Sequence, residues 1–364
     1  MSRIIVVGAG IVGLSVARAA LGRGHAVTVL ERGRIANPQG ASYDQHRLIR
    51  YQYGHAEGYT HMVSQAFAAW ERVWSDLGTQ HFANTGTLGI SMSPGDYVDQ
   101  TLSTFRRIGI PHEVLHRDAV ERLCPQLALP EGSWGLLAQP GGPLFANRIV
   151  DGLAAWVAEK GADIRAHCPV VQVDRDAGKV TLEDGTRIEG DLVVVAAGAW
   201  LSELMPDYAE VPTYRQALCY VEPPQEYQDA WYNGPCLTDL GSGSNYALAP
   251  VEGTGLKFGS GSHRRPGRPS EGFEWDLAEG PEVIGKLAPY LRQATGYRPI
   301  RMQVGYYVMD TSGRFRLDRH GHTLVITNCD GQMFKFGPLL GERVLAAFEG
   351  EQSFADLAQW AAGR

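Results

Sequence analysis

The sequence predicts an α/β protein of two domains, one with a parallel sheet and one with a mixed, largely antiparallel sheet. Residues 4–7 form a short, wholly apolar run that is typical of a strand buried in a parallel sheet, and a glycine-rich turn follows it. Residues 211–307 alternate aromatic and β-branched segments with loops rich in glycine, proline and serine, which indicates an antiparallel sheet. The 364 residues also exceed what one hydrophobic core usually supports.

The expected elements follow in order along the chain. Apolar residues recur at helical spacing over 11–22, and residues 26–30 are typical of a second strand, so the chain opens with a βαβ unit. The later patterns predict a helix at 149–160, a hairpin or meander over 170–182 with a turn at Asp184-Gly185, a buried strand ending at Gly198, antiparallel strands at 217–221, 246–248, 256–258 and 302–307, a last strand at 323–327 and a helix at 338–348.

Composition and charge exclude several classes of partner. The net charge of −7 and a single short basic cluster at 263–268, which we interpret as a solvated loop, argue against nucleic acid. Five scattered cysteines without a C-x-x-C pair predict neither a disulfide framework nor a metal site. No apolar run is long enough to span a membrane, and the first strand begins too near Met1 for a signal peptide, so we expect a cytoplasmic protein.

A G-x-G-x-x-G motif lies between the first strand and the first helix. Gly8, Gly10 and Gly13 allow a tight turn, a close approach of backbone N–H groups to a pyrophosphate, and close packing of helix on strand. Glu31, at the end of the second strand, is placed to accept hydrogen bonds from the adenosine ribose. An acidic residue there disfavours NADP, but the motif alone leaves NAD and FAD open. The glycine-ended strand at 193–198 and the stretch 331–337 fit a simple NAD dehydrogenase poorly and favour FAD.

The sequence resembles the D-amino-acid oxidase superfamily of FAD-dependent oxidoreductases, and within it the monomeric sarcosine oxidase and N-methyltryptophan oxidase group. The resemblance runs nearly end to end and is carried by residues 6–14, 47–54, 194–200, 255–259 and 334–336. It implies a monomer with a glutathione reductase-like Rossmann domain that binds FAD, and a substrate domain of mixed or antiparallel sheet. We expect the FAD-binding domain to comprise residues 1–80, 138–210 and 311–364, and the substrate domain residues 81–137 and 211–310.

Three cationic side chains are candidates for binding a substrate carboxylate or the flavin. Arg47 and Arg50 are three residues apart, and guanidinium groups bind carboxylates in a planar, bidentate way, although the same spacing also fits a solvated helix edge. Lys335 lies between Phe334 and Phe336, where a desolvated ammonium needs a partner. The resemblance implies that Arg50 and Lys335 hold the substrate carboxylate and that Arg47 lies against the flavin. Two cations on one carboxylate indicate an amino acid rather than a plain amine.

Lys257 is the candidate for activating oxygen. It follows Tyr246 by eleven residues, which is the spacing that the family shows between an active-site tyrosine and its oxygen-activating lysine. A positive charge near the flavin stabilises superoxide as it forms, whereas the alternative is an ordinary strand lysine facing solvent. The resemblance also places Tyr246 and Tyr307 in the substrate pocket, where the alternative is core packing.

The resemblance implies further cofactor contacts and also has gaps. The implied contacts are Arg32, Ser42, Val171, Ala197, Gly198, Trp200, Gly331, Gln332, Met333, Phe334 and Lys335. The group attaches FAD through a cysteine whose position is Gly305 here, so we predict noncovalent FAD. Gln332 and Met333 replace a histidine and a glycine, and another family histidine falls on Gly261, although His263 could replace it. The pocket walls therefore differ, and the identity of the substrate is not carried over.

The function expected from these residues is that of an FAD-dependent amine oxidase. A secondary or N-methyl α-amino acid would transfer hydride to flavin N5, its imine would hydrolyse, and oxygen would be reduced to hydrogen peroxide beside Lys257. The other partners expected are thus only the amino acid and oxygen. Two alternatives stay open: an FAD-dependent dehydrogenase that passes electrons to a carrier, and a flavin-binding tailoring or regulatory protein, acting on a different ring amine or on none.

Overall fold

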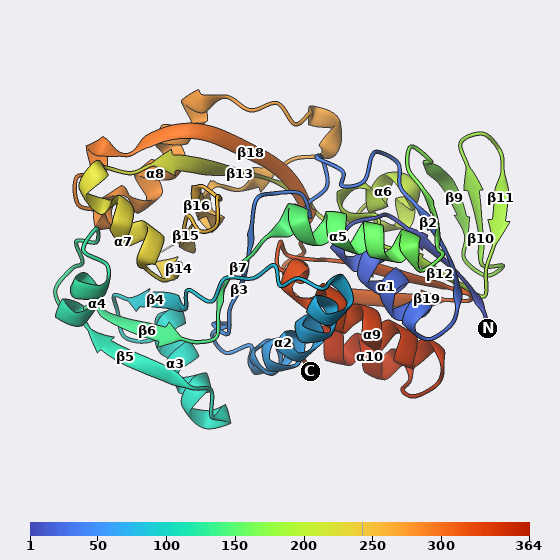
Figure 1. Cartoon of the computed structure of the whole chain (residues 1–364), viewed down its shortest axis with the longest axis horizontal. Coiled ribbons are helices and arrows are strands. Elements are labelled where there is room, and N and C mark those ends of the chain that lie inside the picture. Colours follow the sequence, from blue (N-terminus) through green and yellow to red (C-terminus); the bar gives the residue numbers. More distant parts are fainter. Residues whose placement is uncertain (242) are drawn as a thin grey trace.

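The computed structural model describes residues 1–241 and 243–364 and builds them around two large sheets (Figure 1). The first sheet has six strands in the order β19, β20, β12, β1, β2, β8. Neighbouring strands are parallel except β19, which is antiparallel to β20. The strands are β1 (Arg3–Val7), β2 (Ala26–Leu30), β8 (Asp163–Arg165), β12 (Leu192–Val195), β19 (Arg316–His320) and β20 (Thr323–Thr327).

Both faces of this sheet are covered. Ile4 and Val6 of β1 pack into a core with the helices, whereas Ile5 and Val7, which point the other way, pack into a second core. The helices of the first layer are α1 (Ile11–Gly22), α2 (Glu57–Leu77), α5 (Ala146–Glu159), α9 (Gly337–Phe348) and α10 (Phe354–Ala361). The opposite layer contains α6 (Leu201–Leu204) and the meander of β9 (Val170–Asp174), β10 (Lys179–Leu182) and β11 (Arg187–Glu189). The predicted turn at Asp184-Gly185 joins β10 to β11.

The second sheet has nine strands, in the order β17, β13, β16, β15, β14, β4, β6, β5, with β18 paired to β13. Its only parallel pair within the described residues is β14 with β4, which joins two separate pieces of the chain. The strands are β4 (Thr87–Ser91), β5 (His112–His116), β6 (Trp134–Ala138), β13 (Thr213–Glu222), β14 (Cys236–Leu240), β15 (Asn245–Leu248), β16 (Leu256–Ser260), β17 (Arg265–Pro266) and β18 (Arg298–Val308). The helices of this unit are α3 (Tyr97–Ile108), α4 (Arg117–Leu123), α7 (Gln228–Asn233) and α8 (Gly280–Leu287).

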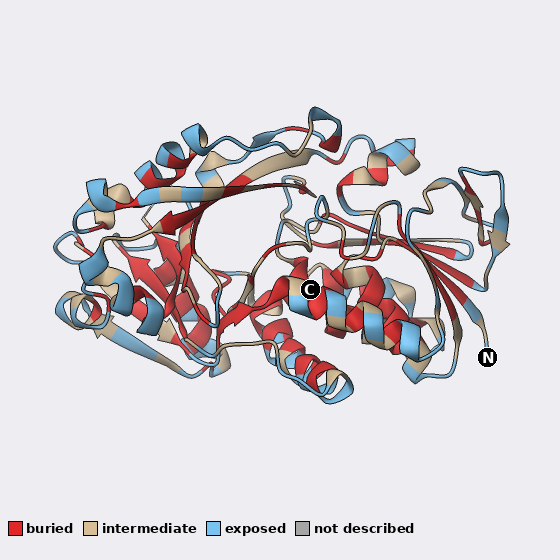
Figure 2. Cartoon of the chain, turned by 45° about the horizontal axis from the view of Figure 1, so that its top comes forward, coloured by how far each residue is buried: buried red, intermediate tan, exposed pale blue. Residues whose placement is uncertain are grey.

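A short two-stranded sheet lies where the chain passes between the units, formed by β3 (Arg47–Ile49) and β7 (Gly142–Leu144). Figure 2 shows the buried residues concentrated along the two sheets and the inner sides of their helices. The predicted fold class is therefore confirmed, while the predicted domain boundaries stay a prediction. In the described part of the chain, no helix combines the length and apolar character needed to cross a membrane.

Candidate active site

One cavity of about 800 Å³ brings the predicted site residues together. Its lining includes the turn after β1, residues of β13–β16 and β18, and the short 3-10 helix η9 (Met333–Phe336). Every residue that the sequence analysis placed in the site lines this cavity except Gly13. A Cβ on Gly13 would lie 1.9 Å from the carbonyl oxygen of Gly8, so this glycine serves the packing of α1 on the turn.

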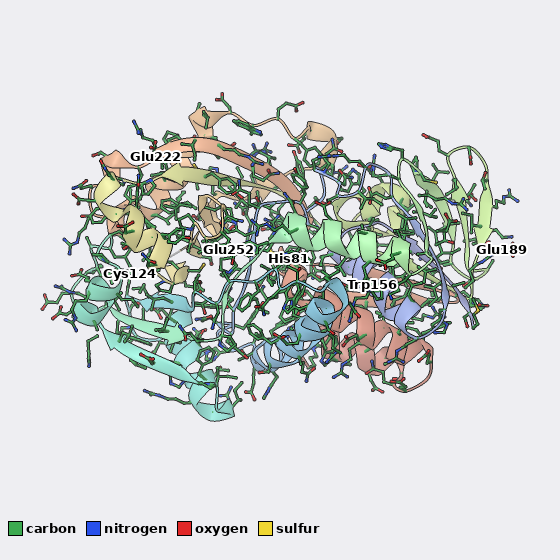
Figure 3. All side chains as sticks on the ribbon, in the orientation of Figure 1. His81, Cys124, Trp156, Glu189, Glu222 and Glu252 are labelled. Carbon is green, nitrogen blue, oxygen red and sulfur yellow. The ribbon has the colours of Figure 1, made fainter. Side chains whose placement is uncertain are left out.

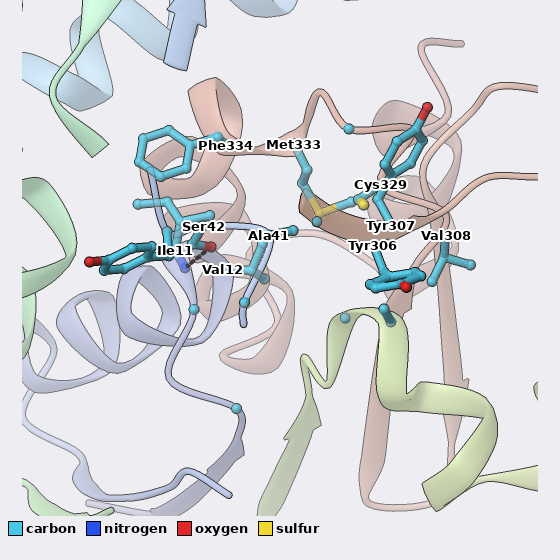
Figure 4. Close-up of a pocket in the computed structure, with 18 of the residues that line it drawn as sticks. Ile11, Val12, Ala41, Ser42, Tyr306, Tyr307, Val308, Cys329, Met333 and Phe334 are labelled. Atoms are coloured by element: carbon cyan, nitrogen blue, oxygen red, sulfur yellow. Dashed lines mark hydrogen bonds between the residues drawn. The ribbon is translucent and has the colours of Figure 1, made fainter. Parts of the chain in front are cut away.

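The glycine turn leaves the N-terminus of α1 open to the cavity. Gly8 has a φ of +104°, and a Cβ there would lie 2.5 Å from the carbonyl oxygen of Ala196. Ser42 accepts a hydrogen bond from the backbone N–H of Ile11 at 2.9 Å, drawn as a dashed line in Figure 4. The first turn of α1 contains no acidic residue. Its positive end and backbone N–H groups therefore suit a phosphate.

Glu31 organises this turn as well as lining the cavity. Its carboxylate accepts hydrogen bonds from the backbone N–H groups of Ala9 and Gly33, both at 2.9 Å, and from the Asn37 side chain at 3.0 Å. The residue is buried, so these charge-assisted bonds form away from bulk water. The guanidinium of Arg32, which also lines the cavity, lies 5.0 Å from the ring centre of Trp200.

We predict that Glu31→Ala empties the cofactor site. Loss of the carboxylate leaves the Ala9 N–H without its acceptor and removes the candidate ribose ligand, so FAD affinity should fall about 10- to 100-fold. The ratio of flavin to protein absorbance after purification measures this. Glu203→Ala is the matched control: Glu203 also lines the cavity, but its exposed ion pair with Arg32 should contribute little. Equal retention of flavin by both variants would contradict the role of Glu31.

Arg50 and Lys335 lie against the same aromatic ring. The Arg50 guanidinium is 5.1 Å and the Lys335 ammonium 5.5 Å from the ring centre of Tyr53. Lys335 is buried and donates to the Tyr53 hydroxyl at 2.9 Å and to the Gln332 carbonyl at 3.2 Å, both neutral acceptors. Burial, together with the nearby Arg50 charge, holds the pKa of Lys335 well below its ordinary value. A carboxylate bound beside Lys335 and Arg50 would offset both the burial of the ammonium and its repulsion by Arg50.

Packing fixes both cations in place. The backbone carbonyl of Lys335 accepts a hydrogen bond at 2.8 Å from Trp70 of α2, which anchors η9. Arg50 follows β3 and donates to the carbonyl of Gln52. The alternative that Arg47 and Arg50 lie on a solvated helix edge is therefore wrong. Arg47 is the first residue of strand β3, Arg50 directly follows that strand, and both side chains are at least four-fifths buried.

Lys257 is buried on β16 and does not face solvent, which overturns the surface alternative. Its ammonium donates to Asp44 at 2.9 Å and to the His46 carbonyl, and Arg47 also pairs with Asp44. Burial by itself would raise the pKa of Asp44, but Lys257 and Arg47 hold it far below its ordinary range. Burial lowers the pKa of Lys257 to about 8, opposed by Asp44. The cluster of Lys257, Arg47 and Asp44 therefore contains two cations and one anion at neutral pH.

The remaining wall of the cavity is aromatic and includes Gly305 and Met333, two of the positions where the sequence differs from the family it resembles. Tyr307 stacks on Tyr214 with ring centres 6.3 Å apart, and the Tyr246 ring covers Gly259, where a Cβ would lie 2.3 Å from it. Burial raises the pKa of Tyr307 to about 12, so its hydroxyl stays protonated. In Figure 4, Tyr306 and Tyr307 of β18 lie on the side of the view opposite Phe334, and the Met333 side chain lies between them. Nothing lies within 4 Å of a Cβ built on Gly305.

The cysteines remain apart. All five are free thiols; Cys124, labelled in Figure 3, is buried in the unit of the nine-stranded sheet, whereas Cys329 lines the cavity. Across the residues that the structure describes, no three His, Cys, Asp or Glu side chains gather closely enough to hold a metal ion.

Sequence reasoning missed two acidic side chains of the site. Asp44 is fully buried; its carboxylate accepts hydrogen bonds from Lys257 and the Tyr220 hydroxyl and forms an ion pair with Arg47. Asp239 is buried at the cavity wall, with Oδ2 3.9 Å from Nη1 of Arg50. Asp44 is close in sequence only to Arg47, whereas Lys257 and Tyr220 are distant from it, and Asp239 is likewise distant from Arg50, so no local spacing marks these contacts.

The fold and site define an FAD-dependent oxidoreductase, and comparison with known proteins identifies the family. Residues 3–347 match the DAO family of FAD dependent oxidoreductases, and the chain belongs to it. N-methyl-L-tryptophan oxidases of Yersinia pestis and Yersinia pseudotuberculosis are 24% identical over 376 residues, covering 99% of this chain and 98% of each relative. The suspected resemblance is thus confirmed at the level of the family.

Solved structures support the fold. L-proline dehydrogenase from P. horikoshii superposes with a TM-score of 0.84 at 18% identity, covering all of this chain and 97% of that one. NikD, an amino acid oxidase essential for nikkomycin biosynthesis, gives a TM-score of 0.82 at 22% identity, covering 99% of this chain and 97% of NikD. The residues present fit FAD: an open helix N-terminus, a buried acid beside it, and a single cavity that extends to a pair of buried cations.

Proposed function

We propose that the protein is an amine oxidase of secondary or N-methyl α-amino acids. The observation that carries the proposal is the pair of buried cations, Arg50 and Lys335, on either side of Tyr53. A buried ammonium among neutral acceptors is costly unless an anion binds. The carboxylate of an amino acid supplies that anion, and the N-methyl-L-tryptophan oxidase relatives favour a secondary amine.

The chain's own residues would bind, orient and shield the substrate. Arg50 and Lys335 hold the carboxylate, and Tyr246 and Tyr307 enclose the rest of the amino acid. FAD, when bound, would accept the hydride from the substrate carbon and pass the electrons to oxygen. Lys257 and Arg47 would supply the positive charge that oxygen reduction requires.

Noncovalent retention of FAD is part of the proposal. Gly305 stands where the family has its linking cysteine, so the glycine turn and Glu31 would be what retains the flavin. Acid precipitation of purified protein tests this: the yellow colour should stay in the supernatant. Colour in the pellet would contradict noncovalent binding.

A panel of secondary and N-methyl α-amino acids, read by peroxide release and by anaerobic bleaching, tests the reaction itself. Bleaching under nitrogen without rapid reoxidation in air would indicate a dehydrogenase. A yellow protein that no amino acid bleaches would indicate a tailoring or regulatory protein. Peroxide release with at least one amino acid is the expected result.

Arg50→Gln tests the carboxylate clamp. Loss of the charge-assisted hydrogen bonds should lower kcat/KM for the best amino acid about 10- to 100-fold, mainly through KM. The matched control is the decarboxylated amine of the same substrate, for which wild type and variant should differ little. An equal loss with both compounds would contradict the assignment of Arg50 to the carboxylate.

A further inference from the structure

Asp239 is a buried carboxylate of the cavity wall that the proposed function leaves unused. It lies on β14 with 8% of its surface exposed. Its Oδ2 is 3.9 Å from Nη1 of Arg50, too far for a hydrogen bond, and no donor among the described residues hydrogen-bonds to this oxygen. A buried carboxylate oxygen without a donor is costly, so it marks a place where a bound molecule supplies one.

The surroundings of Asp239 keep it charged at neutral pH. The charged and titratable groups that face it or the neighbouring Arg50 come from the segment after β3, the start of α3, η9 and the loop before η9: Arg50, Tyr53, Asp96, Tyr97, Lys335 and Asp330. Burial raises the pKa of Asp239 to about 6, whereas Arg50 acts in the opposite direction. Above that pH the group is an anion with an unused acceptor.

The distance between Asp239 and Arg50 matches an amino acid zwitterion. In an α-amino acid one carbon separates the amino nitrogen from the carboxyl carbon, so a carboxylate on Arg50 brings the amino group within a few ångströms of that guanidinium. Asp239 lies at this distance from Arg50, and its Oδ2 has no hydrogen-bond donor among the described residues, whereas Asp330 already accepts from Gln332. We propose that Asp239 binds the α-ammonium group of the substrate and accepts its proton, which yields the neutral amine that can be oxidised. This inference rests on the proposed function.

The proton transfer balances without an added reagent. The N–H bond of the ammonium breaks, an O–H bond forms at Oδ2 of Asp239, and no electron moves. Two opposite charges disappear in a site where charged groups are poorly solvated, so the transfer is easier than in water. The substrate carboxylate, as a like charge beside Asp239, further increases the proton affinity of that side chain.

Two matched probes test the inference on the FAD-loaded protein by calorimetry. N,N-dimethylglycine and 3-methylbutanoate share one skeleton, but only the first carries an ammonium. Asp239→Asn should weaken the binding of dimethylglycine about tenfold or more and leave the binding of 3-methylbutanoate unchanged or tighter. The asparagine keeps the shape of the side chain but lacks its negative charge. With an oxidisable N-methyl amino acid, the Asn variant should gain activity about tenfold per pH unit up to the amine pKa, whereas wild type should level off above the Asp239 pKa.

Asp330→Asn is the charge-matched control. Asp330 also lines the cavity, but its carboxylate accepts a hydrogen bond from Gln332 at 2.7 Å, so its loss should not change the ratio of the two probe affinities. An Asp239→Asn variant that weakens both probes equally, or neither, overturns the inference. Failure of 3-methylbutanoate to bind the wild type would instead count against the carboxylate clamp, and hence against the proposed function.

Discussion

Lys257→Met is expected to slow oxygen consumption with the best amino acid by about 10²–10³-fold, because it removes a preorganised charge from a dry site. Lys257 and Arg47 both line the cavity, whereas Asp44, which pairs with both, does not. The cluster of Asp44, Arg47 and Lys257 thus presents one net positive charge to the cavity. Methionine is similar to lysine in length but uncharged, so the variant cluster has no net charge. Since the pKa of Lys257 is about 8, the wild-type oxygen step should also weaken as the pH rises through that value.

Separate half-reactions distinguish this effect from damage to the site. Anaerobic bleaching of Lys257→Met by the amino acid should stay within a few-fold of wild type, since the clamp residues are unchanged. Reoxidation in air, followed by rapid mixing, should carry nearly the whole loss. If wild-type protein reoxidises no faster than free flavin and the variant behaves identically, the oxidase proposal fails and the dehydrogenase alternative takes its place.

The parts of the fold that local pattern determines were predicted closely. The helix expected at 11–22 is α1, and the strand expected at 26–30 is β2, because apolar periodicity and the flanking glycines are local signals. The order of strands in the nine-stranded sheet was not predicted, because β4 and β14 pair across a long stretch of intervening chain. Such pairing is decided by which apolar faces meet on folding rather than by neighbouring residues.

Residues that line the cavity were predicted where they form a motif, and acids were missed where they meet a distant cation. Resemblance located Arg50, Lys257 and Lys335 through their flanking residues. Asp44 lies 213 residues before Lys257 along the chain, and nothing near either residue indicates the other. Burial was also invisible to the sequence: a lysine in a strand usually faces water, but the fold brings the distant segment with Asp44 and His46 onto the ammonium of Lys257.

Asp44→Asn is expected to destabilise the folded protein at pH 7 by about 3–5 kcal/mol, because it leaves a buried Lys257 without its anion. The neutral amide cannot compensate two cations, and the Tyr220 hydroxyl loses a charged acceptor. Urea unfolding followed by tryptophan fluorescence measures the difference. Asp118→Asn is the matched control: that carboxylate is 79% exposed in its pair with Arg117 and should change stability by less than about 0.5 kcal/mol.

The pH dependence identifies the charge of Asp44 as the cause. The folded-state pKa of Asp44 is depressed, so its contribution is complete above the unfolded-state pKa of about 3.9 and is lost as the pH falls toward the folded value. The gap in unfolding free energy between wild type and Asp44→Asn should therefore be constant from pH 7 to about 5 and narrow below about 4. A gap that persists unchanged at pH 3 would mean that shape and hydrogen bonding, rather than the ionised carboxylate, account for the loss. In that case Asp44 would contribute to stability through its hydrogen bonds alone, and its negative charge would matter only for keeping Lys257 protonated beside the cavity.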